Sequence, residues 1–266
     1  MMYNGEFKNK VGVLIGCSRS TGILMARRYL EEGLRLVIAD INPDIVEIAA
    51  ELKKEFSEAE VYGEILDVTD DAAMEAFFTN IDKKFGCIDM LHYNAGVIAD
   101  LTPITELPMA KFDSLYKVNQ RGVALAIQLG ARIMIKQGYG GSIVTTSSWY
   151  GRKGYGEASA YCASKSACIV LTQVAAIELG KYKIKVNTLA PGDVDSPMTR
   201  DSMKIRAELD GVPFEKLMED RCNLHPLKKI ATFTDVANMA LFCSSSQCGH
   251  TTGQTFFIAG GAELCF

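Results

Sequence analysis

Short runs of apolar and β-branched residues alternate with longer amphipathic segments along the whole chain. Such runs are typical of strands in a parallel sheet, and the longer segments carry the period of helices. The pattern predicts seven strands, at 11–17, 34–40, 61–68, 88–96, 141–148, 185–191 and 254–260. Strand and helix in alternation predict βαβ units, so we expect a three-layer, doubly wound α/β fold. Its seven-stranded parallel sheet would carry helices on both faces.

Helix starts and one irregular segment refine this expectation. One helix is predicted to open at Asn42 and Pro43, and another to occupy 70–85. No repeat or linker interrupts the alternation, which favours one domain over 1–266. The segment 195–226 differs, because it mixes charges with apolar side chains after a strand end. We expect it to be an inserted lid over the substrate, although the same stripe also fits core packing or an oligomer contact.

Composition and charge exclude several classes of function. The chain has 266 residues, 48% of them hydrophobic and 23% charged, which is ordinary globular composition. With a net charge of −4 and scattered basic residues, we expect neither a nucleic acid nor a membrane as a partner. The apolar run near the amino terminus is too short for a signal peptide core. Eight cysteines without a CxxC pair or a histidine cluster predict reduced thiols, a cytoplasmic protein and no metal site.

The turn after the first predicted strand is a candidate anion site. Its sequence, GCSRSTG at 16–22, leads directly into a helical segment. Backbone amides at the start of that helix would face the carboxyl edge of the sheet, where a pyrophosphate binds in dinucleotide folds. Glycines occur in any tight strand-to-helix turn, so the flanking strand and helix carry the prediction. The candidate residues are Gly16, Ser18, Arg19, Ser20, Thr21 and Gly22.

Two charged residues bear on the choice of nucleotide in opposite directions. Asp40 ends the second predicted strand, where a carboxylate would accept hydrogen bonds from an adenosine ribose and repel a 2′-phosphate. Arg19 would instead attract that phosphate. We give Asp40 more weight and expect NAD rather than NADP. Without a cofactor, Asp40 would cap the next turn and Arg19 would be a solvated loop residue.

The segment after the fifth predicted strand carries candidate proton-transfer chemistry. Tyr161 and Lys165 are four residues apart at the start of a predicted helix and share one face. An ammonium about 4 Å from a phenol contributes about 4 kcal/mol at an effective dielectric of about 20, enough to lower the tyrosine pKa by up to about three units. Ser148, at the end of the preceding strand, would hold the substrate oxygen. A Tyr/Lys pair alone is more often a surface contact, so its position among other motifs matters.

Further motifs follow one another in a familiar order. They are Asp67-Val68, the sequence NAG at 94–96, the sequence VN at 118–119 and the sequence PGDVDSPM at 191–198. Together with the glycine-rich turn and the Ser148, Tyr161 and Lys165 set, they resemble the short-chain dehydrogenase/reductase family in its single-domain form, over nearly the whole chain. The resemblance implies a Rossmann-type fold and an oxidoreductase that transfers a hydride between a nicotinamide cofactor and an alcohol or ketone.

The resemblance also assigns residues to roles. It implies Tyr161 as general acid/base, Lys165 on the nicotinamide ribose, Ser148 on the substrate and Asn119 holding a water in a proton relay. Further implied cofactor contacts are Asp40, Ile41, Asp67, Val68, Asn94, Ala95, Gly96, Tyr161, Lys165, Pro191, Gly192, Val194, Ser196 and Met198. Four positions depart from the family pattern, namely Ile15, Ser20, Ser196 and Ala259. Ser20 matters most, because it brings a side chain into the pyrophosphate turn.

The substrate is predicted from the residues that line that side of the site in the family. Here they include Ser148, Trp149, Tyr150, Tyr155 and Tyr161, with several methionines in the lid. This apolar lining predicts a bulky alicyclic alcohol or ketone such as a hydroxysteroid.

Alternatives to this reading remain open. A sugar or polyol would instead require Asp193, Arg200 or Asp201 to point inward. A nucleotide-binding protein without catalysis is the alternative from another class. The resemblance further implies a homo-oligomer, a dimer or tetramer, paired through 106–137 and 158–181.

Overall fold

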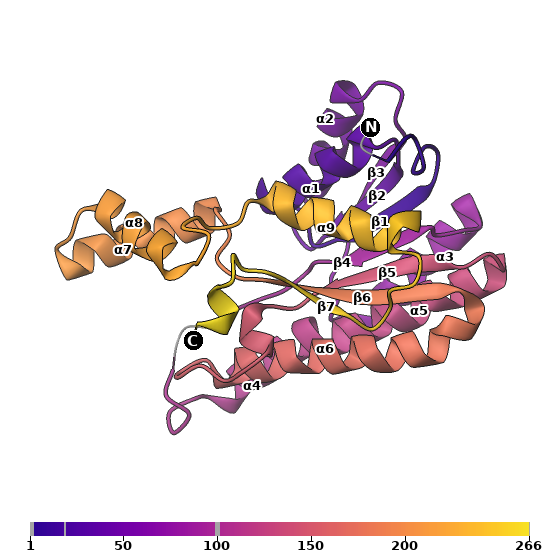
Figure 1. Cartoon of the computed structure of the whole chain (residues 1–266). Helices are drawn as coiled ribbons and strands as arrows, with labels where there is room; N and C mark the ends of the chain where they lie inside the picture. Colours follow the sequence, from indigo (N-terminus) through magenta and orange to yellow (C-terminus); the bar gives the residue numbers. More distant parts are fainter. Residues whose placement is uncertain (1–2, 19, 99–101, 266) are drawn as a thin grey trace.

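The computed structural model of the chain describes residues 3–18, 20–98 and 102–265, apart from the side chains at 20, 21, 197, 198, 202 and 209. Its centre is a seven-stranded sheet, entirely parallel, in the order β3-β2-β1-β4-β5-β6-β7 (Figure 1). The strands are β1 (Val11–Ile15), β2 (Arg35–Asp40), β3 (Val61–Ile65), β4 (Met90–Tyr93), β5 (Gly141–Thr146), β6 (Ile184–Pro191) and β7 (Thr255–Ile258). The predicted doubly wound sheet is confirmed, with each strand inside its predicted segment or one residue beyond it.

Helices cover both faces of the sheet, because strands buried on both sides need apolar cover on both sides. One face carries α1 (Ser20–Glu31), α2 (Ile45–Glu55) and α9 (Phe233–Ser244). The other carries α3 (Asp71–Phe85), α5 (Gly122–Gln137) and α6 (Ser159–Leu179) (Figure 1). Each layer has its own core. Met25 and Leu241 belong to the first, and Phe78 and Met134 to the second.

Local capping explains where two helices begin. The Asp70 side chain accepts from the backbone amide of Ala73, so α3 begins as predicted. Helix α2 begins at Ile45 with Asp44 as its N-cap, two residues later than the predicted cap at Asn42 and first helical residue at Pro43. The reason is local, because the Asn42 side chain accepts from the amide of Asp44 and closes a turn before the helix.

Shorter elements complete the chain. They are α4 (Met109–Tyr116), the π-helical η1 (Lys117–Arg121), and the 3₁₀ turns η2 (Trp149–Gly151), η3 (Gly180–Tyr182), η4 (Ser246–Cys248) and η5 (Ala262–Leu264). Helices α4, η1 and α5 follow one another directly, and the Tyr93 hydroxyl at the end of β4 donates to the Val118 carbonyl inside η1 at 2.7 Å. This contact fixes the π-helical turn against the carboxyl edge of the sheet.

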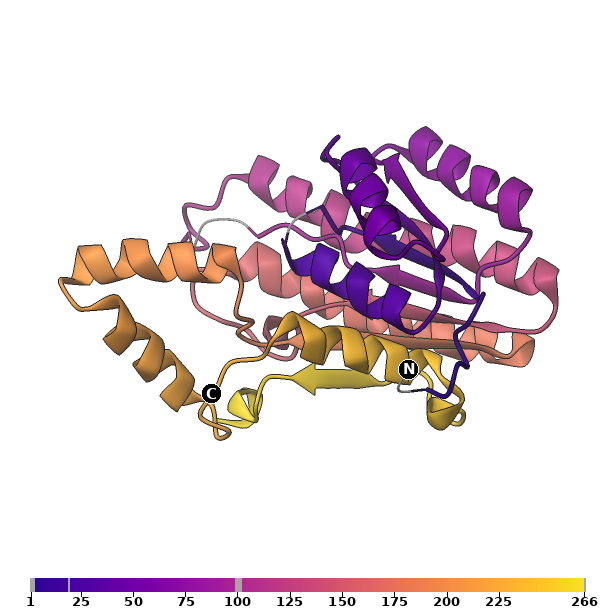
Figure 2. The ribbon, with the colours of Figure 1, turned by 90° about the horizontal axis from the view of Figure 1, so that it is seen from above.

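The segment 195–226 forms two helices, α7 (Pro197–Asp210) and α8 (Phe214–Leu224). Both project from the carboxyl edge of the sheet, as the two views agree (Figures 1 and 2). Among their described side chains only Ala207 is buried. The pair therefore contributes little to the core of the sheet.

Helix α6 and the turn that follows it, 159–182, form the one described segment long and apolar enough to cross a membrane by length and composition alone. Of its most apolar stretch, 44% is buried inside the protein, and the helix packs on β6. A core helix against a sheet has this character.

Candidate active site

The predicted site residues gather where strands β1, β4, β5 and β6 end. All four strands point the same way, so their carboxyl ends share one edge. The strand order reverses between β1 and β4, which leaves a crevice at that edge in doubly wound sheets. Gly16, Asn94, Ser148 and Gly192 follow these four strands.

The turn after β1 requires glycine at both ends. Gly16 has φ +88°, and a β-carbon there would lie 2.3 Å from the backbone nitrogen of Ala95. At Gly22 a β-carbon would lie 2.1 Å from the Cα of Cys17. The chain therefore folds tightly back on itself before α1, whose amino terminus faces the crevice. This shape fits a pyrophosphate bound by backbone amides.

Several residues of this turn escape description. Arg19 lies outside the described residues, as do the side chains of Ser20 and Thr21. The side chain of Met198, a predicted cofactor contact on α7, lies outside them too. Arg19 and Asp40 were predicted to favour different nucleotides. The structure therefore describes only the Asp40 half of that prediction.

Asp40 is anchored by backbone amides. One carboxylate oxygen accepts from the amide of Ser18 at 2.9 Å and the other from the amide of Asn42 at 3.1 Å. The carboxylate is thus both a turn cap, as one interpretation held, and a fixed negative charge beside the glycine-rich turn. Ile41 next to it is exposed. A 2′-phosphate at this position would meet a like charge.

Asp67 and Val68 follow β3. The Asp67 carboxylate accepts from the amide and hydroxyl of Thr69, and Val68 is buried.

Asn94 connects the glycine-rich turn to the end of β5. Its side-chain nitrogen donates to the Gly16 carbonyl at 2.8 Å, and its side-chain oxygen accepts from the Thr146 hydroxyl at 3.1 Å. Ala95 and Gly96 follow directly. A β-carbon at Gly96 would stand 3.1 Å from the Lys165 ammonium, so the missing side chain leaves space above that charge. The absence of a side chain at Gly96 fits a ligand that approaches Lys165.

Asn119 lies in the π-helical turn and is buried. Its side-chain oxygen accepts from the Val97 amide at 2.9 Å, and its side-chain nitrogen donates to the Val97 carbonyl at 2.8 Å and to the Ser164 hydroxyl at 3.1 Å. The amide group therefore ties the segment after β4 to α6. A β-carbon at Gly96 would lie 3.4 Å from the Asn119 side-chain oxygen, so the missing side chain at Gly96 leaves space beside that oxygen as well.

Tyr161 and Lys165 lie one turn apart on α6, and Lys165 is buried. The Lys165 ammonium lies 5.8 Å from the centre of the Tyr161 ring and donates to the Thr146 carbonyl at 2.9 Å. Burial raises the pKa of Tyr161, while a hydrogen bond with Ser148 opposes that rise. Burial also lowers the pKa of Lys165.

The expected lowering of the tyrosine pKa by Lys165 is thus not seen in this structure. The physical reason is desolvation of the phenol, together with an ammonium held by a backbone carbonyl instead of by the phenol oxygen.

Aromatic side chains lie beside Tyr161. Tyr150 stacks on Tyr155 with ring centres 3.9 Å apart and meets Tyr161 edge to face at 5.9 Å. Trp149 is buried and stacks between Tyr150 and His225, at 5.9 Å from each. Tyr150 and Tyr155 therefore form a stacked apolar wall that meets the phenol through Tyr150, and Trp149 contacts both tyrosine rings.

Three polar residues join α8 to the loop after β6. The Asp193 carboxylate accepts from Arg221 at 2.6 Å and contacts His225 at 3.0 Å, and the second ring nitrogen of His225 contacts the Ala259 carbonyl at 2.8 Å. Arg200 pairs with Asp195 on the surface, and Asp201 lies near Lys204. Asp193 is thus engaged within the protein, and the other two predicted polar lid residues are paired at the surface.

The loop after β6 passes close to Trp149. A β-carbon at Gly192 would lie 2.7 Å from the Ala259 side chain and 3.4 Å from the indole, so only glycine fits there. Pro191 ends β6, Val194 bridges to Ala231, and the Ser196 hydroxyl caps α7 by accepting from the amide of Thr199.

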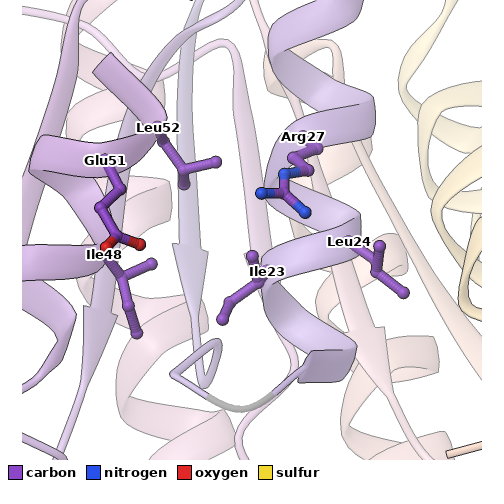
Figure 3. Close-up of a pocket in the computed structure, with 6 residues that line it drawn as sticks. All are labelled: Ile23, Leu24, Arg27, Ile48, Glu51 and Leu52. Atoms are coloured by element: carbon purple, nitrogen blue, oxygen red, sulfur yellow. The ribbon is translucent and has the colours of Figure 1, made fainter. Parts of the chain in front are cut away.

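A cavity of about 280 Å³ lies elsewhere, between α1 and α2 (Figure 3). Its lining is largely aliphatic, with Ile23 and Leu52 extending into the space between the helices, and Arg27 and Glu51 nearby. None of the predicted catalytic residues lines it.

Some site residues were missed from sequence. Four residues outside the predicted motifs form hydrogen bonds or ion pairs with other residues of the site. They are His92, Thr146, Arg221 and His225. A histidine in an otherwise apolar strand is the one available signal, since a buried imidazole must find hydrogen-bond partners.

Comparison with known proteins identifies relatives across nearly the whole chain. The family model described as enoyl-(acyl carrier protein) reductase matches residues 16–263. Levodione reductase of Leifsonia aquatica is 31% identical over 98% of this chain and 97% of its own length. Sorbitol dehydrogenase of Cereibacter sphaeroides is 32% identical over 95% and 96%.

Solved structures agree with these relatives. A crystal structure of NAD⁺-bound xylitol dehydrogenase superposes with a TM-score of 0.88 at 27% identity, covering 96% of this chain and all of its own. A structure of ElxO with NADP bound has a TM-score of 0.85, also at 27% identity, covering 95% and 98%. Both nucleotides thus occur among proteins of this shape.

Proposed function

Since the chain belongs to the short-chain dehydrogenase/reductase family and is an NAD(P)-dependent oxidoreductase acting on CH–OH groups, we propose that Tyr161, Lys165 and Ser148 carry out its reaction. The reaction interconverts a secondary alcohol and a ketone. The observation that carries this proposal is that a half-buried phenol, a buried serine hydroxyl and a buried ammonium come together beside the carboxyl edge of the sheet.

Proton transfer falls to Tyr161. The raised pKa keeps its hydroxyl protonated at neutral pH, so in the direction of reduction its Oη donates a proton to the carbonyl oxygen of the substrate. In the direction of oxidation, the same oxygen accepts the proton of the alcohol. Ser148, which opposes the rise in the Tyr161 pKa, would orient the substrate oxygen. Asn119 would hold a water that connects this proton to solvent.

The cofactor residues fit a dinucleotide. When bound, the nicotinamide ring supplies or accepts the hydride. The glycine-rich turn would hold the pyrophosphate and Lys165 the nicotinamide ribose. An ammonium has three donors, and Thr146 takes one of them. We propose NAD over NADP because the Asp40 carboxylate is fixed by two amides where a 2′-phosphate would lie.

The catalytic assignment is tested with Tyr161→Phe. Turnover should fall by about a thousandfold, within the range that general acid/base catalysis contributes, while NADH binding, measured by the fluorescence of the nucleotide, stays within about twofold. A Phe variant with near-normal turnover would refute the assignment. Wild-type protein that binds NADH but turns over nothing in a broad panel would favour the non-catalytic alternative.

The cofactor preference is tested by comparing initial rates with NAD and NADP. Faster turnover per unit concentration with NAD is expected, and Asp40→Ala should narrow the difference. A wild-type preference for NADP would show that Asp40 does not determine the choice of nucleotide and would favour Arg19 as the residue that does.

For the substrate we propose a bulky alicyclic alcohol or ketone, such as a hydroxysteroid. The stacked wall of Tyr150 and Tyr155 beside Tyr161 supports this, as does similarity to a levodione reductase. A polyol is the second candidate, because a sorbitol dehydrogenase and a xylitol dehydrogenase are also similar. A panel of cyclic alcohols and polyols with NAD separates them, since turnover of polyols alone would exclude the alicyclic substrate.

We propose that α7 and α8 close over the bound substrate as a lid. Their position at the carboxyl edge and their few buried side chains support this role (Figure 2).

We also propose a cytoplasmic location, which the eight free cysteines support. A homo-oligomer is proposed because α6 exposes the apolar side chains of Val170, Val174 and Ile177. Light scattering measures the oligomeric state.

A further inference from the structure

A chain of hydrogen-bonded side chains runs from the core of the sheet to the glycine-rich turn. It begins at Tyr29 on α1, whose hydroxyl lies 2.7 Å from Nδ1 of His92 on β4. Nε2 of His92 lies 2.9 Å from the hydroxyl of Thr146 on β5. That hydroxyl and the Asn94 side chain continue the chain to the carbonyl of Gly16. Tyr29 and His92 are both fully buried, so no water can replace the hydrogen bond between them. Thr146 and Asn94, at the end of the chain next to the glycine-rich turn, are half-buried.

The Gly16 carbonyl, at the end of the chain, sets the donor and acceptor of every hydrogen bond before it. The Gly16 carbonyl only accepts, so the Asn94 amide donates to it and turns its oxygen to Thr146. The Thr146 hydroxyl must then donate to Asn94 and accept from Nε2 of His92. His92 therefore carries its hydrogen on Nε2, and its Nδ1 accepts from the Tyr29 hydroxyl.

The charge of His92 agrees with this direction. Burial lowers the pKa of His92 to about 3, so the ring is neutral at physiological pH and carries one hydrogen. A second hydrogen on Nδ1 would face the Tyr29 oxygen and force that hydroxyl to turn away. The neutral Nε2–H form is the one that satisfies the whole chain.

Thr146 joins this chain to the proton-transfer residues. Its hydroxyl belongs to the chain, and its carbonyl accepts from the Lys165 ammonium at 2.9 Å. One residue thus touches both the path to the Gly16 turn and the lysine beside Tyr161. Its orientation matters to both halves of the site.

We propose that His92 is a positioning residue for dinucleotide binding, which through Thr146 and Asn94 holds the Gly16 turn in its binding shape. The proposal rests on the proposed function, because it concerns the cofactor site of that reaction. His92 itself does not touch the cofactor, since it lies on β4 beneath the turn. Its effect is therefore on the affinity for the dinucleotide more than on proton transfer.

Three variants test the role. His92→Leu removes both hydrogen-bonding groups of the ring, whereas His92→Gln keeps an amide donor for Thr146 and an oxygen acceptor for Tyr29. Ser142→Ala is the matched control, because Ser142 is buried on the same strand as Thr146 but donates to the Cys243 carbonyl, away from the chain. The Kd for NADH is measured by fluorescence on each folded protein, with circular dichroism to establish folding.

The Leu variant should weaken NADH binding about tenfold, as expected for lost buried hydrogen bonds, and raise the KM for the nucleotide more than it lowers kcat. The Gln variant should recover most of that affinity, and the Ser142 control should bind like wild type. Equal affinity of the Leu variant and wild type would overturn the role. So would a Ser142 variant weakened as much as the Leu variant, because the loss would then be general.

Nitrogen NMR of the ligand-free protein supplies an independent reading. His92 should show the neutral Nε2–H form between pH 5 and 8. The Nδ1–H form, or an imidazolium in this range, would overturn the chain as described, whatever the protein binds. If wild type binds neither NADH nor NADPH, the proposed function and the positioning role fail together. If wild type binds NADH and the Leu variant binds it equally well, only the positioning role fails.

Discussion

Lys165 donates to the main-chain carbonyl oxygen of Thr146 at 2.9 Å, although Tyr161 lies one helical turn away on the same helix. The Thr146 carbonyl, at the end of β5, therefore holds the ammonium in place. Two other features lie next to this contact. The missing side chain at Gly96 leaves room above the charge, and the hydroxyl of Thr146 belongs to a chain of hydrogen-bonded side chains. Substitutions around this contact should therefore change nucleotide binding and turnover without unfolding the protein.

Replacing Lys165 by Met should lower turnover by about a hundredfold or more, because the site loses its ammonium while a side chain of similar length remains. The nucleotide should also bind more weakly. Steady-state kinetics measures both effects. Lys181→Met is the control, since this exposed lysine after α6 lies over the Tyr182 ring and should leave both constants unchanged. A Lys165 variant with wild-type kinetics would contradict the assigned role.

Gly96→Ala should weaken nucleotide binding and turnover by about tenfold, because the new methyl group would stand 3.1 Å from the Lys165 ammonium and 3.4 Å from the Asn119 oxygen. Stability should change little, since both neighbours are side-chain ends. Gly180→Ala tests the same substitution in the 3₁₀ turn η3, where an added β-carbon would meet no neighbouring element within 4 Å. Its kinetics should match wild type, and identical kinetics for Gly96→Ala would show that the space above Lys165 is not used.

Stability should fall with acid partly through His92. Its pKa is about 3 in the folded protein and about 6.5 in the unfolded chain, so between these values the unfolded chain binds one more proton. Unfolding is thus favoured as the pH falls from about 6.5 towards 3, and the contribution is constant above that window. For this group the loss is about 2 kcal/mol between pH 7 and pH 5.

Urea denaturation at pH 7, 6 and 5 measures the loss. His92→Gln should show a correspondingly shallower pH dependence, because glutamine does not titrate. Parallel curves for the two proteins would mean that His92 is charged or exposed in the folded state.

Asp193→Ala should loosen α8 and expose Trp149. The substitution removes the acceptor for both Arg221 and His225, and His225 stacks on the indole. Because Arg221 is about one-third exposed, the loss of stability should be about 1–3 kcal/mol, less than for a fully buried pair.

Trp149 is the only tryptophan, so a red shift of the intrinsic emission reports the change directly. Asp195→Ala removes the exposed contact with Arg200 and should cost less than about 0.5 kcal/mol without an emission shift. An unshifted spectrum in the Asp193 variant would show that the three polar residues do not hold the indole.

Much of the fold was predictable because its causes are local. The alternation of apolar runs and amphipathic segments specifies parallel strands buried on both faces, and all seven strands lie where that pattern predicts. Glycines at 16 and 22 are required by a tight turn that the sequence already indicates. The start of α2 was misplaced, because the Asn42 side chain closes a turn where a cap was expected.

The predicted catalytic side chains come together in the fold, but their contacts could not be predicted from the sequence. Helical spacing places Tyr161 and Lys165 on one face of α6, yet spacing alone does not tell how much water surrounds the phenol. Burial raises the pKa of Tyr161, where an adjacent ammonium was expected to lower it. Trp149 likewise belongs to the aromatic cluster, but it lies behind Tyr150 and against His225.

The sequence by itself thus determined the sheet, the position of the glycine-rich turn and the order of the proposed reactive residues, since periodicity, turn chemistry and motif spacing act over short stretches of chain. Only the tertiary structure decided which buried polar groups pair. The link from His92 to Thr146 depends on the register of β4 against β5, and the contacts of Asp193 depend on where α8 returns to the sheet. Those pairings join residues far apart in the chain, and a buried donor or acceptor takes whichever partner the packed fold brings within reach.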